Sequence, residues 1–333
     1  MSRRLRSVSL VLAAMCAAAG CGSTVDLAKV TYTRTTVPAA AVRQGSGGGS
    51  SSAAPKTNDP AFTSEKLRKI DACGLLDKNT LTAVGTPDEN QVSDFSQCAN
   101  YMKDPDGKEL NITLTLGEGL IESPSRADQN IGGLPAIEQE LDDKSACFQT
   151  VVTETSPNRG IKIQVGGKAP DLCAVGRTVL GAVVGRIRRD PPAYPATAGT
   201  IREVDPCAAV PAADLRTALG ADAKPNPTSL HWCTWSASGA DVWVWLRSGV
   251  DPAKGADPAK TKKVDLGGIS ATQEAENTAS AKCEVSWAQL PLRTDFAEVV
   301  SVTFIRYTPT AGEDVCAKAQ VIARSLVPKL PKK

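Results

Sequence analysis

Eight cysteines fall into two sets of four with nearly the same spacing, and this pattern most constrains the fold. The first set has successive gaps of 25, 49 and 26 residues: Cys73, Cys98, Cys147 and Cys173. The second has gaps of 26, 50 and 33: Cys207, Cys233, Cys283 and Cys316. The sets begin 134 residues apart, which is too long a period for a solenoid repeat. The spacing therefore predicts tandem duplication of one domain.

Other landmarks keep the same register in both halves. The stretch "DACGLLDKNTLTAVG" (71–85) is similar to "DPCAAVPAADLRTALG" (205–220). A glycine pair precedes the third cysteine of each set, at 132–133 and 267–268. An aspartate lies two residues before each fourth cysteine, at Asp171 and Asp314. These coincidences support the duplication independently of the cysteines.

We expect these eight cysteines to form structural disulfides. Two separate domains of four allow nine pairings, and we favour first with second and third with fourth in each half. The first pair would join an opening helix to a strand, and the second would join a hairpin to a closing helix. Each closed loop of about 26 residues should contribute about 3 kcal/mol. No CxxC pair is present, which argues against a zinc site, so no metal or cofactor is expected.

The fold class predicted for both halves is α+β, an antiparallel sheet with an N-terminal and a C-terminal helix. The stretches 110–116 and 241–248 alternate with a period of two and are expected to be strands. Two hairpins are expected further on, over 147–166 and 283–307. The opening helices should begin near Asp77 and Pro211 and end at Gly85 and Gly220. The closing helices should span 171–187 and 314–327, with Asp171 and Asp314 as N-caps.

The N-terminus is typical of an export signal. Three arginines precede an apolar run over 8–19, which is too short for a permanent membrane span. The sequence "AAGC" (18–21) is similar to a bacterial lipobox, which would place a lipid on Cys21. Ordinary cleavage after Ala19 is the alternative, and it would leave Cys21 as an unpaired thiol. Because Cys21 is the odd cysteine of the mature chain, we favour lipidation.

Composition shifts divide the chain into five predicted segments. Residues 1–20 are a lipoprotein signal peptide, and 21–63 are a flexible tether that contains "GSGGGSSSAAP". The first repeat domain covers 64–189, a proline-rich linker covers 190–200, and the second repeat domain covers 201–333.

The sequence lacks the residues that several classes of function require. The net charge is +2 with both signs interspersed, which argues against nucleic-acid binding. The single histidine, His231, lies beside a cysteine assigned to a disulfide. No GxSxG, HExxH or P-loop pattern occurs in the mature chain, so no catalytic residue is assigned. An enzyme that uses carboxylates alone stays open, with "QELDD" (139–143) as one acidic cluster.

All five tryptophans lie in the second half. Trp243 and Trp245 share one face of a strand. They are candidates, with two tryptophans that bracket Cys233, for an aromatic binding platform: Trp232, Trp235, Trp243 and Trp245. The alternative is a core packed with large side chains. The matching strand of the first half carries Ile112, Leu114 and Leu116, so only the second domain would have a platform.

The landmarks resemble the actinobacterial lipoproteins of domain-of-unknown-function family 3558. They are Asp205-Pro206-Cys207 with Gly220, Cys233-Thr234-Trp235, the glycine pair at 267–268 with Cys283, and Asp314-Val315-Cys316. The first half departs from this pattern: Ala72 stands in place of the proline, and Ala99-Asn100 stands in place of the Thr-Trp pair. The resemblance covers about residues 70–330. It implies an envelope lipoprotein and no catalytic activity.

The expected function is a non-catalytic binding or sensing module, held on the extracytoplasmic side of the cell membrane by a palmitate-bearing lipid on Cys21. A structural or protein-interaction accessory is the alternative. The expected partners are the membrane and an envelope lipid, glycan or protein.

Overall fold

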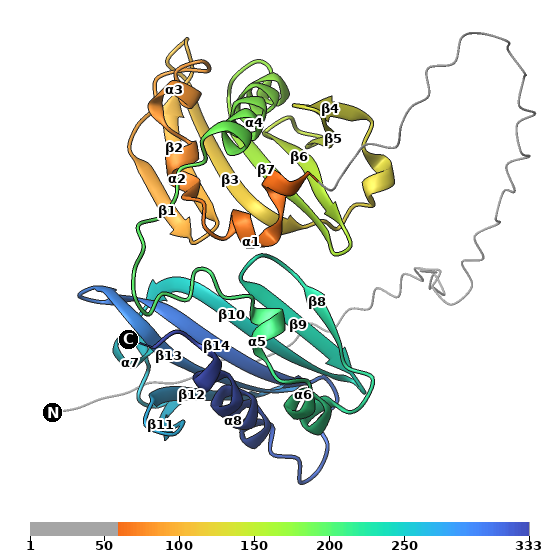
Figure 1. Ribbon diagram of the computed structural model, residues 1–333, viewed down its shortest axis with the longest axis vertical. Helices are drawn as coiled ribbons and strands as arrows, with labels where there is room; N and C mark the ends of the chain where they lie inside the picture. Colours follow the sequence, from red (N-terminus) through yellow and green to blue (C-terminus); the bar gives the residue numbers. More distant parts are fainter. Residues whose placement is uncertain (1–58, 333) are drawn as a thin grey trace, which may run out of the picture. The chain divides into compact units, whose positions relative to one another are not determined.

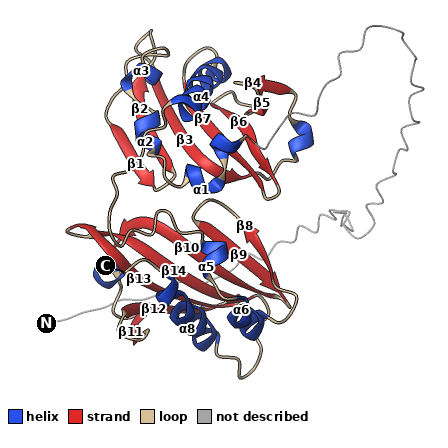
Figure 2. Ribbon diagram, viewed as in Figure 1, coloured by secondary structure: helices blue, strands red, loops and turns tan. Residues whose placement is uncertain are grey.

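Two seven-stranded antiparallel sheets form the framework of the computed structural model, which describes residues 59–332 (Figures 1 and 2). Ser52–Lys333 make one compact unit. The predicted signal peptide, the lipid site at Cys21 and most of the tether lie outside the described residues. The fold class is therefore α+β, as expected. The domain boundaries at 189 and 201 stay a prediction.

The first sheet has the order β1-β2-β3-β7-β6-β5-β4. Its strands are β1 (Asn90–Asp94), β2 (Gln97–Lys103), β3 (Glu109–Gly119), β4 (Gln129–Ile131), β5 (Leu134–Glu140), β6 (Ala146–Thr155) and β7 (Asn158–Gly167). The helices of this half are η2 (Pro60–Phe62), α1 (Ser64–Leu67), α2 (Ala72–Leu75), α3 (Lys78–Leu81), η3 (Pro124–Arg126) and α4 (Leu172–Arg189).

The second sheet has the same order, strand for strand: β8-β9-β10-β14-β13-β12-β11. Its strands are β8 (Lys224–Pro227), β9 (Trp232–Ala237), β10 (Ala240–Val250), β11 (Thr261–Asp265), β12 (Ser270–Asn277), β13 (Ala281–Arg293) and β14 (Phe296–Arg306). The helices are α5 (Pro206–Ala209), α6 (Ala212–Leu219), α7 (Pro252–Gly255), α8 (Val315–Leu326) and η4 (Val327–Lys329).

Aspartates cap the closing helices as the sequence indicates. Asp171 Oδ1 accepts a hydrogen bond from the Ala174 N–H at 2.7 Å, and Asp314 Oδ1 accepts from the Ala317 N–H at 2.9 Å. The opening helix of the first half is shorter than expected, because α3 ends at Leu81 rather than at Gly85. Its Lys-Asn-Thr-Leu-Thr sequence has weaker helix propensity than the alanine-rich α6, which does reach Gly220.

Four disulfides join helices to strands with the pairing that the spacing predicts. Cys73–Cys98 joins α2 to β2, and Cys207–Cys233 joins α5 to β9. Cys147–Cys173 joins β6 to α4, and Cys283–Cys316 joins β13 to α8. Each pair is therefore fixed at both ends in regular structure.

Each sheet packs one face against its own closing helix and so buries one hydrophobic core. In the first core, alternate β3 residues such as Ile112 and Leu114 pack with Val179 and Val183 of α4. In the second, Val242 and Val244 of β10 pack with residues of α8. Alternation along a strand places the intervening residues on the opposite face, called here the outer face.

The two cores exchange one side chain each. Leu230, from the second half, is fully buried in the first core, and Phe95, from the first half, is buried in the second. Gly117 makes room for Leu230: its φ is +63°, and an added Cβ would lie 2.3 Å from Leu230 Cγ. The halves are thus joined by reciprocal apolar contacts.

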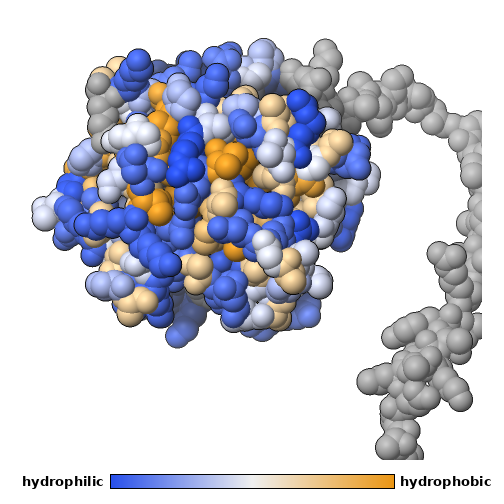
Figure 3. Space-filling model, turned by 90° about the horizontal axis from the view of Figure 1, so that it is seen from below, coloured by the Kyte–Doolittle hydropathy of each residue, from blue (hydrophilic) through white to orange (hydrophobic). Residues whose placement is uncertain are grey.

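The surface mixes polar and apolar side chains. On the face shown in Figure 3, apolar residues gather in small groups separated by hydrophilic ones. Among residues 59–332, no helix combines the length and the apolar character needed to cross a membrane.

Candidate ligand-binding face of the second sheet

The outer face of the second sheet carries three of the five tryptophans. Trp243 and Trp245 alternate with the core residues Val242, Val244 and Leu246 along β10. Trp232 on β9 lies directly opposite Trp245 in the antiparallel register, so it shares their face. Trp245 is 41% exposed, and Trp232 and Trp243 are half-buried.

The other two tryptophans belong to the core. Trp235 is 1% exposed and lies opposite Val242, and Trp287 is also 1% exposed. The expectation that Trp235 contributes to a platform is therefore wrong. Trp235 is three residues from Trp232, and an odd separation along a strand puts the two side chains on opposite faces. The sequence contained this signal.

Among the three outer tryptophans, Trp232 contacts both of the others. The rings of Trp232 and Trp243 meet edge to face with centroids 5.8 Å apart, and those of Trp232 and Trp245 are tilted at 6.0 Å. Such pairs add about 0.5–1.5 kcal/mol beyond area burial. The result is a fixed aromatic surface, called here the Trp cluster (Trp232, Trp243 and Trp245).

Polar groups border the Trp cluster. Asp241 Oδ2 accepts from Trp243 Nε1 at 3.2 Å and from the Tyr307 hydroxyl at 2.6 Å. The bond to Asp241 raises the pKa of Tyr307 to about 12. On the other side, the Arg247 guanidinium lies 5.0 Å from the centre of the Trp245 ring. The cluster thus has a carboxylate at one border and a cation at the other.

A groove continues from Arg247 across the same face. Its volume is about 200 Å³, and it runs between α7 and the strands. In the strand register, Trp245, Ser301, Ser286 and Thr272 form one row. Trp243, Thr303, Glu284 and Glu274 form the next row. Sequence reasoning missed these polar residues, although Ser301 and Thr303 alternate with Val300, Val302 and Phe304 in the predicted strand.

The first sheet has no equivalent of the Trp cluster. Superposing the two strand orders on Cys98 and Cys233 places Gln97, Thr113 and Thr115 where Trp232, Trp243 and Trp245 lie. Ile112, Leu114 and Leu116 lie on the matching strand, but they are not the counterparts of these tryptophans, because all three face the core. Their counterparts are Val242, Val244 and Leu246.

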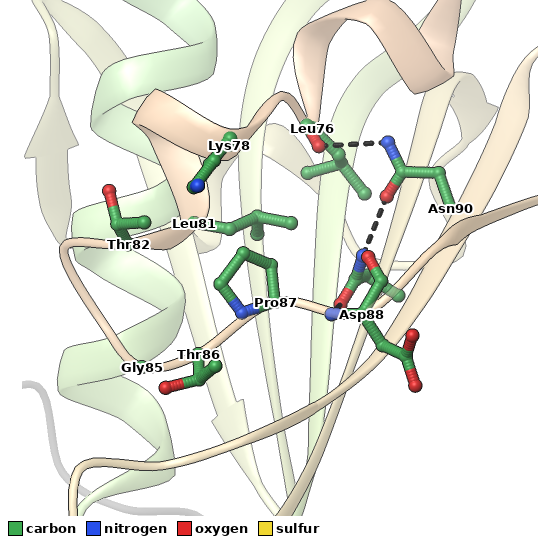
Figure 4. Close-up of a pocket in the computed structure, with 10 residues that line it drawn as sticks. Leu76, Lys78, Leu81, Thr82, Gly85, Thr86, Pro87, Asp88 and Asn90 are labelled. Carbon is green, nitrogen blue, oxygen red and sulfur yellow. Dashed lines mark hydrogen bonds between the residues drawn. The ribbon is translucent and has the colours of Figure 1, made fainter.

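The first half contains a different cavity, of about 380 Å³, between α3 and the start of β1 (Figure 4). Asn90 Nδ2 donates to the Leu76 and Cys73 carbonyl oxygens, and Asn90 Oδ1 accepts from Asn100 Nδ2 at 2.8 Å. Asn100 Nδ2 also donates to the Asp88 carbonyl oxygen. These amides hold the turn beside the Cys73–Cys98 bond, so their role here is structural.

His231 joins the two halves. Its Nε2 is 2.6 Å from the Arg202 carbonyl oxygen, which only accepts, so Nε2 carries the proton. Its Nδ1 then accepts from the Ser96 hydroxyl at 2.8 Å. Burial lowers the pKa of His231 to about 4. A 3% exposed imidazole that is so weakly basic does not suit proton abstraction from Ser96 at neutral pH.

Two other acidic groupings are explained by local structure. In "QELDD" the last residues form an exposed turn, where Asp143 accepts from the Ser145 hydroxyl at 2.6 Å. This hydrogen bond lowers the pKa of Asp143. Glu138 lies near the sulfurs of Cys147 and Cys173, but those sulfurs are joined in a disulfide and Glu138 pairs with Arg177. Neither grouping forms a metal centre.

Neither a protein-family model nor a curated protein matches the chain. Among solved structures, the chain is weakly similar to the di-domain ARO/CYC protein BexL from the BE-7585A biosynthetic pathway. The identity is 12%, the match covers 80% of this chain and 90% of that one, and the TM-score is 0.16. A TM-score this low does not establish a shared fold.

Proposed function

We propose that this chain is an exported lipoprotein whose paired sheets act as a non-catalytic binding or sensing module at the cell envelope. The lipid on Cys21 would hold it on the extracytoplasmic side of the membrane. The resemblance to the family 3558 lipoproteins supports this placement, and so does the assignment of all eight remaining mature cysteines to disulfides.

The observation that carries the binding function is the Trp cluster on a sheet face outside the core. Large aromatic side chains on a strand are normally buried, as Trp235 and Trp287 are. Three tryptophans on the outer face, of which Trp232 contacts the other two, therefore favour a surface that is covered when a ligand binds. The duplicated sheet has Gln and Thr residues at these positions, so the fold itself does not require them.

The test is native mass spectrometry of the mature protein extracted from its own membranes. We expect a covalent mass that starts at Cys21, carries a lipid and includes four disulfides. We also expect a non-covalent adduct that disappears in the double variant Trp243→Thr/Trp245→Thr, which copies the first sheet.

The matched control is Tyr101→Thr. Tyr101 is 56% exposed on the outer face of the first sheet, and its removal should leave the adduct in place. A mass that starts at Gly20 without a lipid would contradict the anchor. A copurified protein in place of a small ligand, unaffected by the tryptophan variant, would contradict the binding function and favour a protein-interaction accessory.

A further inference from the structure

Between the Trp cluster and the groove, the sheet contains a buried hydroxyl group with no partner. Ser301 is 4% exposed, and its Oγ has no hydrogen-bond partner among residues 59–332. Ser301 lies between Trp245 on β10 and Ser286 on β13. An unsatisfied buried hydroxyl costs about 1–3 kcal/mol, so the row of residues beside the groove is not arranged for stability alone.

Arg247 presents a second unsatisfied atom at the same place. Its Nε is buried without a partner within the described part of the chain, while its guanidinium stacks over Trp245. Asp94 lies nearby: it accepts from the Ser248 N–H at 3.1 Å, and burial raises its pKa. Arg247 thus links the aromatic surface to the groove.

The far side of the groove is acidic. Glu274 and Glu284 lie directly opposite each other on β12 and β13. Like charges in this position destabilise a sheet. Neither carboxylate makes an ion pair within 4.0 Å in the described region, and both line the groove. Both are therefore available as acceptors for hydroxyl or ammonium donors.

From this combination, and resting on the binding function above, we propose that the ligand is a glycan without negative charge. The Trp cluster would contact the apolar face of a sugar ring, while Glu274 and Glu284, which line the groove, would bond its hydroxyl or amino groups. An acyl chain would leave the polar groups of the groove unsatisfied, which lowers affinity. An anionic polymer would meet two unpaired carboxylates.

The dimensions fit a chain that extends beyond the groove. A volume of about 200 Å³ is smaller than the roughly 300–1,000 Å³ of pockets that enclose drug-sized ligands. The groove therefore holds one end or one unit of the glycan, and neighbouring units lie along the tryptophans.

The test applies the full chain to an array of neutral, amino-bearing and anionic oligosaccharides, with vesicles of phosphatidylglycerol as a separate probe. We expect retention on neutral or amino-bearing glycans. Trp243→Thr/Trp245→Thr should weaken binding at least about tenfold, and Glu284→Gln should weaken it severalfold. The control Tyr101→Thr should bind as the unmodified chain does.

Retention only on anionic glycans or vesicles would overturn the ligand class but leave the binding function intact, provided the tryptophan variant abolishes it. No retention on glycans, together with a peptide or lipid adduct by native mass spectrometry, would also overturn the ligand class and leave the binding function intact. The absence of any ligand in both experiments would overturn the binding function itself. Circular dichroism of each variant separates lost contacts from lost folding.

Discussion

At the scale of single residues, His231 shows how one buried polar group can connect two parts of a chain. The side chain is neutral, and its two ring nitrogens bond to Ser96 and to the Arg202 carbonyl oxygen. Protonation would place a second donor against the Ser96 hydroxyl and a charge in an apolar contact. The interface therefore depends on an uncharged imidazole.

We predict that acid destabilises the fold through His231. Its pKa is about 4 in the folded chain and about 6.5 when exposed, so the unfolded chain binds more protons between these values. This contribution to stability is therefore complete above about pH 6.5 and is lost as the pH falls toward about 4, by at most about 3–4 kcal/mol. His231→Gln should show a smaller difference in the free energy of unfolding between about pH 4.5 and about pH 7.5.

Denaturant titrations of the two proteins at both pH values supply this measurement. Carboxylates titrate equally in both proteins, so the difference between their pH dependences isolates the histidine. Equal pH dependences would show that the pKa of His231 is the same in the folded and the unfolded chain, contrary to the prediction.

At the scale of elements, each half is held by two helix–strand disulfides around an antiparallel sheet. Cys147–Cys173 and Cys283–Cys316 fix the closing helices α4 and α8 to β6 and β13. The same helices bury apolar residues against the sheet, so covalent and hydrophobic contacts act on one pair of elements. Helix and strand should therefore separate only when the whole half unfolds.

Removing either closing disulfide is predicted to cost about the same free energy. The loops span 26 and 33 residues, and loop entropy depends only weakly on this difference. Cys147→Ala/Cys173→Ala and Cys283→Ala/Cys316→Ala should each lower the unfolding free energy by about 3 kcal/mol. Guanidinium unfolding measures both. A cost below about 1 kcal/mol for one pair would show that packing alone holds that helix.

At the scale of the whole molecule, the duplicated halves are not independent. Phe95 is buried in the second core and Leu230 in the first, although each belongs to the other half of the sequence. Arg68 adds two polar contacts, an Nε bond to the Leu230 carbonyl oxygen at 2.9 Å and an ion pair with Asp205 at 2.9 Å. Loss of one core should therefore weaken the other.

We predict that Phe95→Ala loosens the sheet of the opposite half. Truncating a buried Phe costs about 3–5 kcal/mol, and the cavity would lie in the second core. Hydrogen–deuterium exchange should rise in β10 and β14. Val92→Ala is the control, because Val92 lies on the preceding strand and is 63% exposed. Faster exchange confined to β1 and β2 would mean that the halves unfold separately.

Local signals in the sequence determined much of the secondary structure and the disulfide pairing of this protein. The cysteine spacing gave the disulfide pairing, the aspartates at 171 and 314 gave the helix caps, and alternation gave the long central strands and both hairpins. These features depend on residues that are close in sequence or on a repeat that is visible without coordinates. The short α3 departs from the expectation because its Lys-Asn-Thr-Leu sequence has a lower helix propensity than the alanine-rich α6.

Only the tertiary structure decided which tryptophans contact one another, which polar residues line the groove, and which side chains the halves exchange. Register across strands sets these outcomes, because it brings together Trp245, Ser301 and Ser286 from segments far apart in the chain. A single sequence carries alternation within a strand but not the pairing between strands, and the proposed binding face exists only once the strands are paired.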